Sequence, residues 1–133
     1  MSQQSSILTA FNNHFMEFVD DIILVFPNDT DLLAAKNSLA LIRKANPKMI
    51  IKIWSSYVVN KYATEIDAGD IGFFINKDYK DDLERAENSE KIMESIDRLR
   101  NPIRLMSEED RGKSMKYIQN LKKLSILYEQ IGK

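Results

Sequence analysis

Residues 8–25 read LTAFNNHFMEFVDDIILV, and this stretch decides the fold. Its large apolar side chains recur at steps of 3, 4, 3, 4 and 3, the period of one face of an α-helix. These apolar positions are Leu8, Phe11, Phe15, Phe18, Ile22 and Val25. The face expected on the opposite side carries the polar residues Asn12, Glu17, Asp20 and Asp21. The stretch therefore predicts a long amphipathic helix, with a cap at Ser5 or Ser6 and an end at Phe26-Pro27.

The last part of the chain carries a second seam of the same kind. Its apolar residues follow steps of 4, 3, 4 and 3, at Tyr117, Leu121, Leu124, Tyr128 and Ile131. The preceding Ser107-Glu108-Glu109-Asp110 resembles a capping box and predicts the start of this helix. An isolated helix of this length cannot bury its own stripe. We therefore expect the first and last long helices to contact each other.

Three more helices are expected between these two. They start at Asp29 or Thr30, at Pro47, and at Asn88 or Ser89. Their inward positions are Leu32, Ala35, Leu39 and Ile42 in the first, Ile50, Ile53, Trp54, Tyr57 and Val58 in the second, and Ile92, Ile96, Leu99 and Ile103 in the third. Asn101-Pro102 is expected to kink or break the third of these helices.

The region between the second and third of these helices is read from its turn residues. Gly69 is the natural left-handed residue after a helix end. The short apolar run 71–75 is expected to be a helical turn, because a lone strand has no partner in this chain. The charged stretch 76–87 is either a solvated helix or an excursion from the bundle.

These patterns predict an all-α protein. With 4 glycines and 3 prolines in 133 residues, the chain has few of the turn residues that sheet proteins need. Its length fits one domain with a real core. We expect a compact single-domain helical bundle of about five or six helices over residues 1–133.

Composition removes several classes of function. The chain has no cysteine, which excludes disulfides, thiolate nucleophiles and cysteine-based zinc sites. No apolar run reaches the ~18 residues that a membrane-spanning helix needs. The N-terminal MSQQSSILTAF lacks a basic region and a continuous apolar core, so we expect no secretion signal.

Charge is divided into four alternating blocks. Residues 1–31 carry five acids and no base, and residues 32–64 carry six bases and no acid. Residues 65–110 carry fourteen acids against seven bases, and residues 111–133 carry six bases against Glu129 alone. The block charges of −5, +6, −7 and +5 sum to the net charge of −1. A near-neutral total thus hides strong local fields, which govern encounter and assembly.

Candidate catalytic and metal-binding residues are few. His14 is the only histidine, and a structural or interfacial role is favoured over a metal pair with a nearby carboxylate. Glu65, Asp67 and Asp70 crowd the helix end at Gly69, without the spacing of a calcium loop. A second acidic cluster, Asp78, Asp81, Asp82 and Glu84, is interleaved with bases and is typical of a solvated face. We predict no catalytic residue, no metal site and no cofactor.

The basic residues are the best candidates for contact with a partner. Lys44, Lys48 and Lys52 repeat every four residues, close to Trp54 and Tyr57. Bases with aromatic neighbours are used on nucleic-acid surfaces, but helical periodicity places these two aromatics on the buried face. Acidic blocks of this or another protein are at least as plausible as partners. The candidate interaction surface comprises Lys44, Lys48, Lys52, Arg111, Lys113 and Lys116.

Three segments resemble a known group of proteins: FNNHFMEF at 11–18, DAGDI at 67–71 and SMKYIQNL at 114–121. Together they are similar to small uncharacterised proteins of the nucleocytoplasmic large DNA viruses that infect algae and amoebae. The resemblance covers nearly the whole chain but carries no known activity or site residue. It implies a viral factory in host cytoplasm, or a place in the virion.

Two functions follow as expectations from this reading. The first is a non-enzymatic protein-interaction or structural component, such as a minor virion or assembly protein. The alternative is a nucleic-acid-associated accessory factor of viral replication or transcription that uses the basic segments. The expected partner is another protein or a second copy more than nucleic acid, with no membrane and no small-molecule substrate.

Overall fold

The computed structural model describes residues 3–76 and 90–132, and every regular element among them is helical. This confirms the predicted all-α class. The long helices are α1 (Gln3–Val25), α2 (Thr30–Ala45), α7 (Glu90–Leu105) and α8 (Glu108–Gly132). Between α2 and α7 lie α3 (Met49–Trp54), the π-helical η1 (Ser55–Val59), α4 (Asn60–Asp67) and the short α5 (Gly72–Asn76). The acidic cluster at residues 78–84 and the predicted cap at Asn88 or Ser89 lie outside the described residues.

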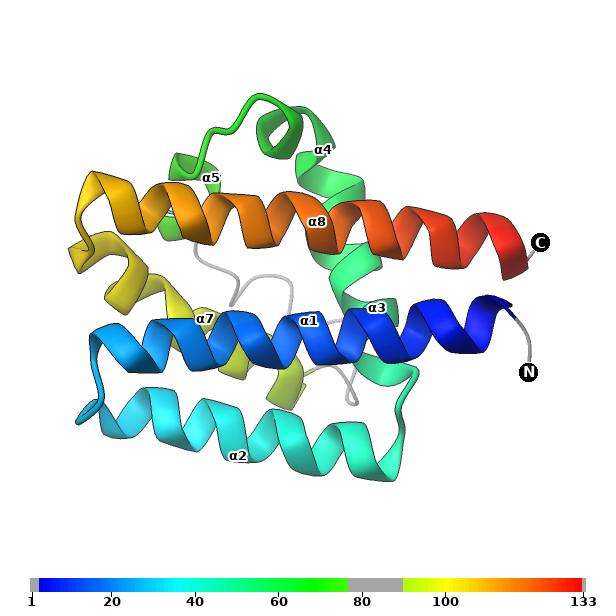
Figure 1. Ribbon diagram of the computed structural model, residues 1–133, viewed down its shortest axis with the longest axis horizontal. Coiled ribbons are helices and arrows are strands. Elements are labelled where there is room, and N and C mark those ends of the chain that lie inside the picture. The colour runs from blue at the N-terminus through cyan, green and yellow to red at the C-terminus, as the bar shows by residue number, and fades with distance from the viewer. Residues whose placement is uncertain (1–2, 77–89, 133) are drawn as a thin grey trace.

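Helices α1 and α8 lie side by side and antiparallel, so that both chain ends are at the same end of the molecule (Figure 1). At that end the Gln4 side chain donates from Nε2 to the Tyr128 carbonyl at 3.2 Å. Near the other end the Phe18 and Tyr117 rings stack at 5.5 Å. The predicted contact between the first and last long helices is thus confirmed.

The seam of α1 forms the centre of the core. Four residues of the predicted stripe, Phe11, Phe15, Phe18 and Ile22, are completely buried. Val25 at the end of the stripe is 40% exposed. The helix begins at Gln3, upstream of the predicted caps at Ser5 and Ser6. Asn12 is also different from expectation, because it is buried and donates from Nδ2 to the Pro47 carbonyl at 2.9 Å. Since α1 contacts α2, α3 and α8, its buried face is wider than one stripe.

Helix α2 begins as predicted. Asp29 is its N-cap, and its carboxylate accepts from the backbone N–H groups of Asp31 and Leu32. The next helix starts later than expected, at Met49, because the backbone from Asn46 to Lys48 forms a turn. In that turn the Asn46 side chain accepts from the Lys48 N–H.

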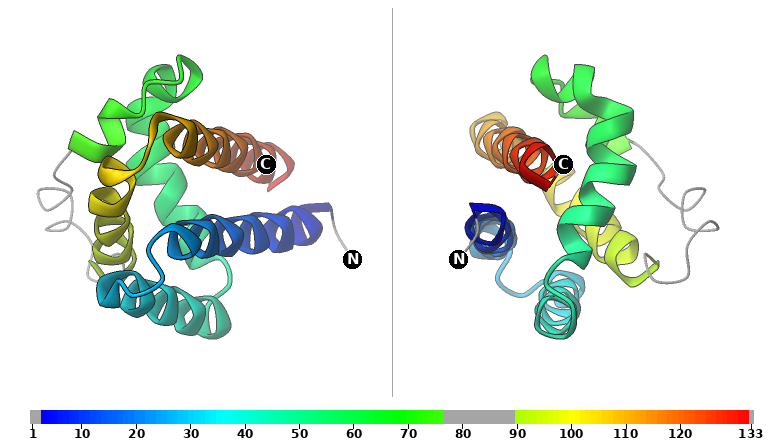
Figure 2. Two further views of the ribbon diagram at one scale, coloured as in Figure 1. Left: turned by 60° about the vertical axis from the view of Figure 1, so that its left-hand side comes forward. Right: turned by 90° about the vertical axis from the view of Figure 1, so that its right-hand side faces the viewer.

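The segments α3, η1 and α4 run on from one another and cross behind α1 and α8 (Figures 1 and 2). Trp54 is fully buried and meets Phe15 edge to face at 5.3 Å. The following turn is π-helical, with the Asn60 N–H bonded to the Ser55 carbonyl. A second irregularity follows at Tyr62, whose φ of −123° and ψ of 23° are not helical. The sequence indicated neither feature.

The end of α4 is a Schellman motif. Gly69 has a φ of +75°, its N–H bonds the Ile66 carbonyl, and the Asp70 N–H bonds the Glu65 carbonyl. This confirms Gly69 as the left-handed residue. The run 71–75 that follows contributes α5, which confirms a helical turn there rather than a strand.

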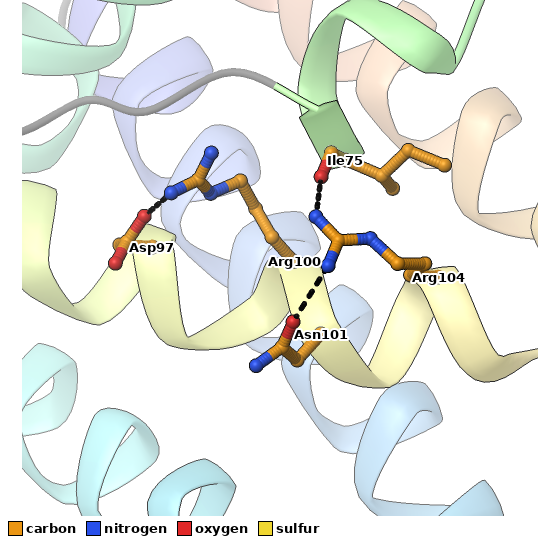
Figure 3. A network of polar contacts seen from close by, with 5 residues as sticks. All are labelled: Ile75, Asp97, Arg100, Asn101 and Arg104. Atoms are coloured by element: carbon orange, nitrogen blue, oxygen red, sulfur yellow. Dashed lines mark hydrogen bonds and ion pairs between the residues drawn. The ribbon is translucent and has the colours of Figure 1, made fainter.

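Helix α7 lies against α2 and α5 and buries Ile92, Ile96, Leu99 and Ile103, as predicted. Pro102 lies inside this helix, so Asn101-Pro102 does not end it. The helix continues because Ile103 and Met106 beyond the proline are held in the core. Figure 3 shows that Arg104 reaches the Ile75 carbonyl of α5 and the Asn101 side chain, while Arg100 pairs with Asp97.

Helix α8 starts where predicted, and its buried face is wider than the predicted seam. The Ser107 hydroxyl accepts from the Asp110 N–H at 3.2 Å, as a cap does. Of the seam, Leu121 is buried, Tyr117, Leu124 and Tyr128 pack partly buried against the core, and Ile131 is 40% exposed. Because α8 contacts α1 along one side and η1 and α4 along another, Ile118 and Ser125 are completely buried as well.

Candidate interaction surfaces

An extended hollowed surface lies between α1 and α8. Two adjoining hollows share His14 and Asn120 in their linings and together form one groove. We call it the α1–α8 groove. Its lining includes His14, Glu17 and Asp21 on α1, and Lys113, Lys116, Tyr117, Asn120 and Lys123 on α8. One wall is therefore acidic and the other basic.

The basic wall follows from helical spacing. Lys113, Lys116, Asn120 and Lys123 are separated by steps of 3, 4 and 3, which places them on one face of α8. All three lysines are exposed, and none forms an ion pair within the described part of the chain. We call these three lysines the α8 lysine row. They are available to an acidic partner.

Tyr117 lies at the centre of the groove. Its ring is 4.7 Å from the His14 ring and 5.5 Å from the Phe18 ring, measured between centroids. Desolvation by burial, the hydrogen bond to Asp21 and the charges of Asp21 and Glu17 raise the pKa of Tyr117 to about 12. The phenol is therefore neutral at physiological pH and acts as a hydrogen-bond donor.

His14 lies in this groove next to Tyr117. Its Nδ1 is 3.7 Å from a Glu17 carboxylate oxygen one turn further along α1, and its Nε2 is buried with no hydrogen-bond partner among the described residues. Its ring covers that of Tyr117. Among the described residues, no group of three or more His, Asp or Glu side chains is arranged to hold a metal ion. The structural or interfacial role of His14 stays a prediction.

The carboxylates around Gly69 point to helix termination. Asp67 forms an ion pair with Lys122 of α8, and the Asp70 side chain accepts from the Gly72 N–H at 2.9 Å. Gln119 of α8 donates to the Ile66 carbonyl at 2.9 Å. These contacts attach the end of α4 to α8.

Ion pairs between described residues join charge blocks of opposite sign. Asp20 of the first block pairs with Lys36 of the second at 2.8 Å. Asp67 of the third block pairs with Lys122 of the fourth. The acidic α1 also lies beside the basic α8 along the groove. Part of the charge of the blocks is therefore neutralised by contacts within the molecule. The α8 lysine row forms no such ion pair among the described residues.

The six basic residues predicted as a surface fall into separate places. Lys44 lies with Arg43 beside a hollow between α1 and α2. Lys48 and Lys52 flank a hollow whose other wall holds Tyr128 and Glu129, near the C-terminus of α8. The remaining three residues, Arg111, Lys113 and Lys116, lie in the first turns of α8.

Along α8, the distance from Lys113 to Glu129 is about 24 Å at 1.5 Å per residue, which separates the two groups of bases. Lys44, Lys48 and Lys52 are exposed and form no ion pair among the residues described. Arg111 instead donates to the Arg104 carbonyl at the end of α7. Arg111 therefore helps to hold the turn between α7 and α8 together.

The sequence reading missed several residues that shape these surfaces. Tyr117 was predicted only as a core residue, and Lys123 was not selected at all. The spacing from Lys113 to Lys123 was a usable signal for the lysine row. The contact of Ser55 with Glu129, at 2.5 Å, depends on the crossing of η1 and α8 and left no pattern in the sequence.

Comparisons with known proteins place the chain in no family: no family model, curated protein or solved structure matches it. Within the described residues, no helix combines the length and apolar character needed to cross a membrane.

Proposed function

We propose that this protein is a non-enzymatic protein-interaction or structural component that binds an acidic segment of another protein along the α1–α8 groove. The observation that carries the proposal is the α8 lysine row, three exposed lysines on one helix face without ion pairs in the described chain. Such a row recognises carboxylates, while Tyr117 and Leu124, which line the same groove, offer apolar contact to the face of a partner helix.

The chemistry of the groove supports a binding role over a catalytic one. The pKa of Tyr117 is about 12, so its phenol is protonated near neutral pH and cannot serve as a base there. His14 faces an aromatic ring and a carboxylate of its own helix. Asp67 and Asp70 are engaged in an ion pair and a turn. We therefore propose that the protein is not an enzyme.

The viral context is part of the same proposal. The resemblance of three segments to small proteins of large DNA viruses gives an infected host cell as the setting, with a partner in the viral factory or the virion. A protein with complementary charged surfaces suits assembly, because such surfaces steer docking and penalise wrong orientations.

The alternative is an accessory factor that binds nucleic acid. Lys44, Lys48 and Lys52 favour it, because they are exposed and form no ion pair with another described residue. Two observations weigh against it. Trp54 is completely buried and offers no stacking surface, and Lys48 and Lys52 lie beside Glu129, about 24 Å along α8 from Lys113. We therefore rank the protein partner first.

One binding experiment separates the two functions. Its probes are a labelled amphipathic peptide with a row of glutamates and a labelled DNA duplex, each measured at low and at physiological salt. We expect the peptide to bind, and the variant Lys116→Glu/Lys123→Glu to weaken binding about tenfold or more, since it reverses two charges of the row. The matched control Lys44→Glu/Lys48→Glu should bind the peptide as the wild type does.

The outcomes of this experiment are distinct. Tight binding of the duplex at physiological salt, lost in the Lys44→Glu/Lys48→Glu variant, would reverse our ranking. Equal loss of peptide binding in both variants would show a general charge effect and contradict the groove. Affinity capture from infected cells, with the Lys116→Glu/Lys123→Glu variant alongside, then identifies the natural partner as a protein that the wild type alone retains.

A further inference from the structure

An apolar surface is exposed at the end of the molecule where α1 and α7 finish and α8 begins, on the left in Figure 1. Leu24 is 78% exposed and Leu105 is 74% exposed, the two highest values among the large apolar side chains described as exposed. Val25, which follows Leu24 at the end of α1, is 40% exposed. We call this surface, with the hollow described next, the end face.

A hollow opens directly beside Leu24. It has a volume of about 190 Å³, and its apolar lining includes Ile22, Leu24, Val25 and Met106. A dry cavity of about 150 Å³ already holds a benzene-sized group. The hollow is thus large enough to receive one leucine side chain. A projecting leucine and a hollow that fits it lie next to each other on the same face.

A projecting side chain next to a hollow of matching size suits a twofold contact between identical copies. Here the projecting side chain, or knob, is Leu24 and the hole is the hollow beside it. In such a contact the same patch on both copies must be complementary to itself, so that each copy inserts its knob into the hole of the other. A patch built for a different protein needs only one of the two features.

The charged rim of the hollow is also complementary to itself. Asp21 and Asp110 contribute acids and Lys113 contributes a base. A rotation of 180° can bring the acids of one copy opposite the lysine of the other. The net charge of −1 adds almost no long-range repulsion between two copies.

We propose that the end face is a docking surface for a second copy of this chain, with Leu24 of each copy seated in the hollow of the other. The inference rests on the proposed role in protein interaction and names one partner and the surface that it uses. The apolar part is only a few side chains wide, much less than in permanent dimers. We therefore expect a dimer that forms and dissociates with protein concentration.

Sedimentation equilibrium over micromolar to millimolar concentrations tests the proposal. We expect the wild type to show a monomer–dimer equilibrium and Leu24→Glu to weaken it about tenfold or more, because a carboxylate cannot enter the apolar hollow. Leu41→Glu is the matched control. Leu41 is 68% exposed but lies near the C-terminal end of α2, and we expect no effect there.

A second measurement locates the contact. The chain has no cysteine, so Leu24→Cys and Leu41→Cys each introduce a single thiol. We expect a short bis-maleimide reagent to link copies of Leu24→Cys much faster than copies of Leu41→Cys. Circular dichroism should show wild-type helicity for all these variants, since both leucines project into solvent.

Three results would overturn the inference. They are a monomeric wild type over the whole concentration range, equal weakening by Leu24→Glu and Leu41→Glu, or equal linking of the two cysteine variants. The proposed function is tested apart from this, because the acidic-peptide experiment uses Lys116 and Lys123, which do not line the end hollow. A monomer that still binds the peptide would remove the self-association and leave the proposed function standing.

Discussion

At the scale of single residues, Tyr117 shows how three neighbours define one side chain. Phe18 stacks on its ring, the His14 ring lies 4.7 Å from it, and the Asp21 carboxylate accepts a hydrogen bond from its hydroxyl. Burial in this setting disfavours the phenolate, and the nearby carboxylates add to the effect. The seam in the sequence predicted that Tyr117 faces inward, but its contact with Asp21 could not be predicted because it depends on how α1 and α8 align.

Tyr117 therefore provides a prediction about pH. Its pKa in the folded protein is raised to about 12, above the ordinary value of 10.0. Between these values the unfolded chain loses the proton while the folded protein keeps it, so stability falls as pH rises from about 10 to 12. The stabilising contribution is complete below pH 10 and is lost as pH passes the folded pKa.

Ultraviolet absorbance during alkaline titration measures this directly, because tyrosinate absorbs differently from tyrosine. Tyr117 should ionise later than an unperturbed phenol. Tyr117→Phe should remove that late phase, and Asp21→Asn should move it to lower pH. A titration curve that Tyr117→Phe leaves unchanged in shape would contradict the assignment.

Asn12 marks the limit of sequence reading at the residue scale. Asparagine is polar, and its place beside Phe11 gave no sign that α1 is covered on several sides. In the fold its side chain satisfies the carbonyl of Pro47, a group in the turn between α2 and α3. Helical periodicity reports one face of a helix, whereas a buried polar contact depends on what the other elements bring to it.

At the scale of elements, the local signals were reliable where local chemistry decides. Asp29 and Ser107 cap helices, and Gly69 ends one, because these roles depend on a few neighbouring backbone groups. The signals failed where tertiary contacts decide. Pro102 remains inside α7, and η1 takes a π-helical turn, because core packing on both sides fixes the backbone.

Two glycines offer a matched test of this distinction. Gly69 has a φ of +75°, and an added Cβ would meet only Gln119 Nε2 at an ordinary 3.9 Å. The cost of Gly69→Ala is therefore conformational, and we expect a loss of about 1 kcal/mol in the free energy of unfolding. Gly112 lies inside α8 with open space around it. Gly112→Ala should stabilise the protein by about 0.5–1 kcal/mol.

Urea unfolding of the two variants measures both changes against the same wild type. Opposite signs are the expected result. A gain in stability for Gly69→Ala would show that the Schellman motif does not hold residue 69 in the left-handed region. A loss for Gly112→Ala would show that the first turns of α8 are not an ordinary helix.

At the scale of the whole molecule, the sequence predicted the class of fold and the contact between the first and last long helices. Both depend on which helix faces are apolar and must be buried, and the periodicity of the sequence indicates those faces. The charge blocks were visible too, but their pairing was not. The pair of Lys36 with Asp20 requires α2 to lie beside α1, and the pair of Lys122 with Asp67 requires α8 to lie beside α4. The row from Lys113 to Lys123 was visible in its spacing, but the places of Lys44, Lys48 and Lys52 relative to that row depend on the tertiary arrangement and could not be foreseen.

This pairing of blocks leads to the last prediction, on salt. Opposite charges that meet across elements attract one another, and salt screens this attraction as the Debye length falls from about 30 Å at 0.01 M to about 8 Å at 0.15 M. The stability of the folded protein should therefore decrease over this range. Exposed pairs contribute little each, so we expect a total change of about 1 kcal/mol or less.

Urea unfolding at the two salt concentrations measures the change, and two double variants identify its origin. Asp20→Asn/Asp67→Asn removes the acids that join different blocks, and we expect it to flatten the salt dependence. Glu94→Gln/Asp97→Asn removes two acids that pair within α7, and should leave most of the dependence in place. Stability that rises with salt would mean that repulsion within the blocks outweighs attraction between them. In that case the segregated charge would be a source of strain in the monomer, which favours binding to a partner of opposite charge.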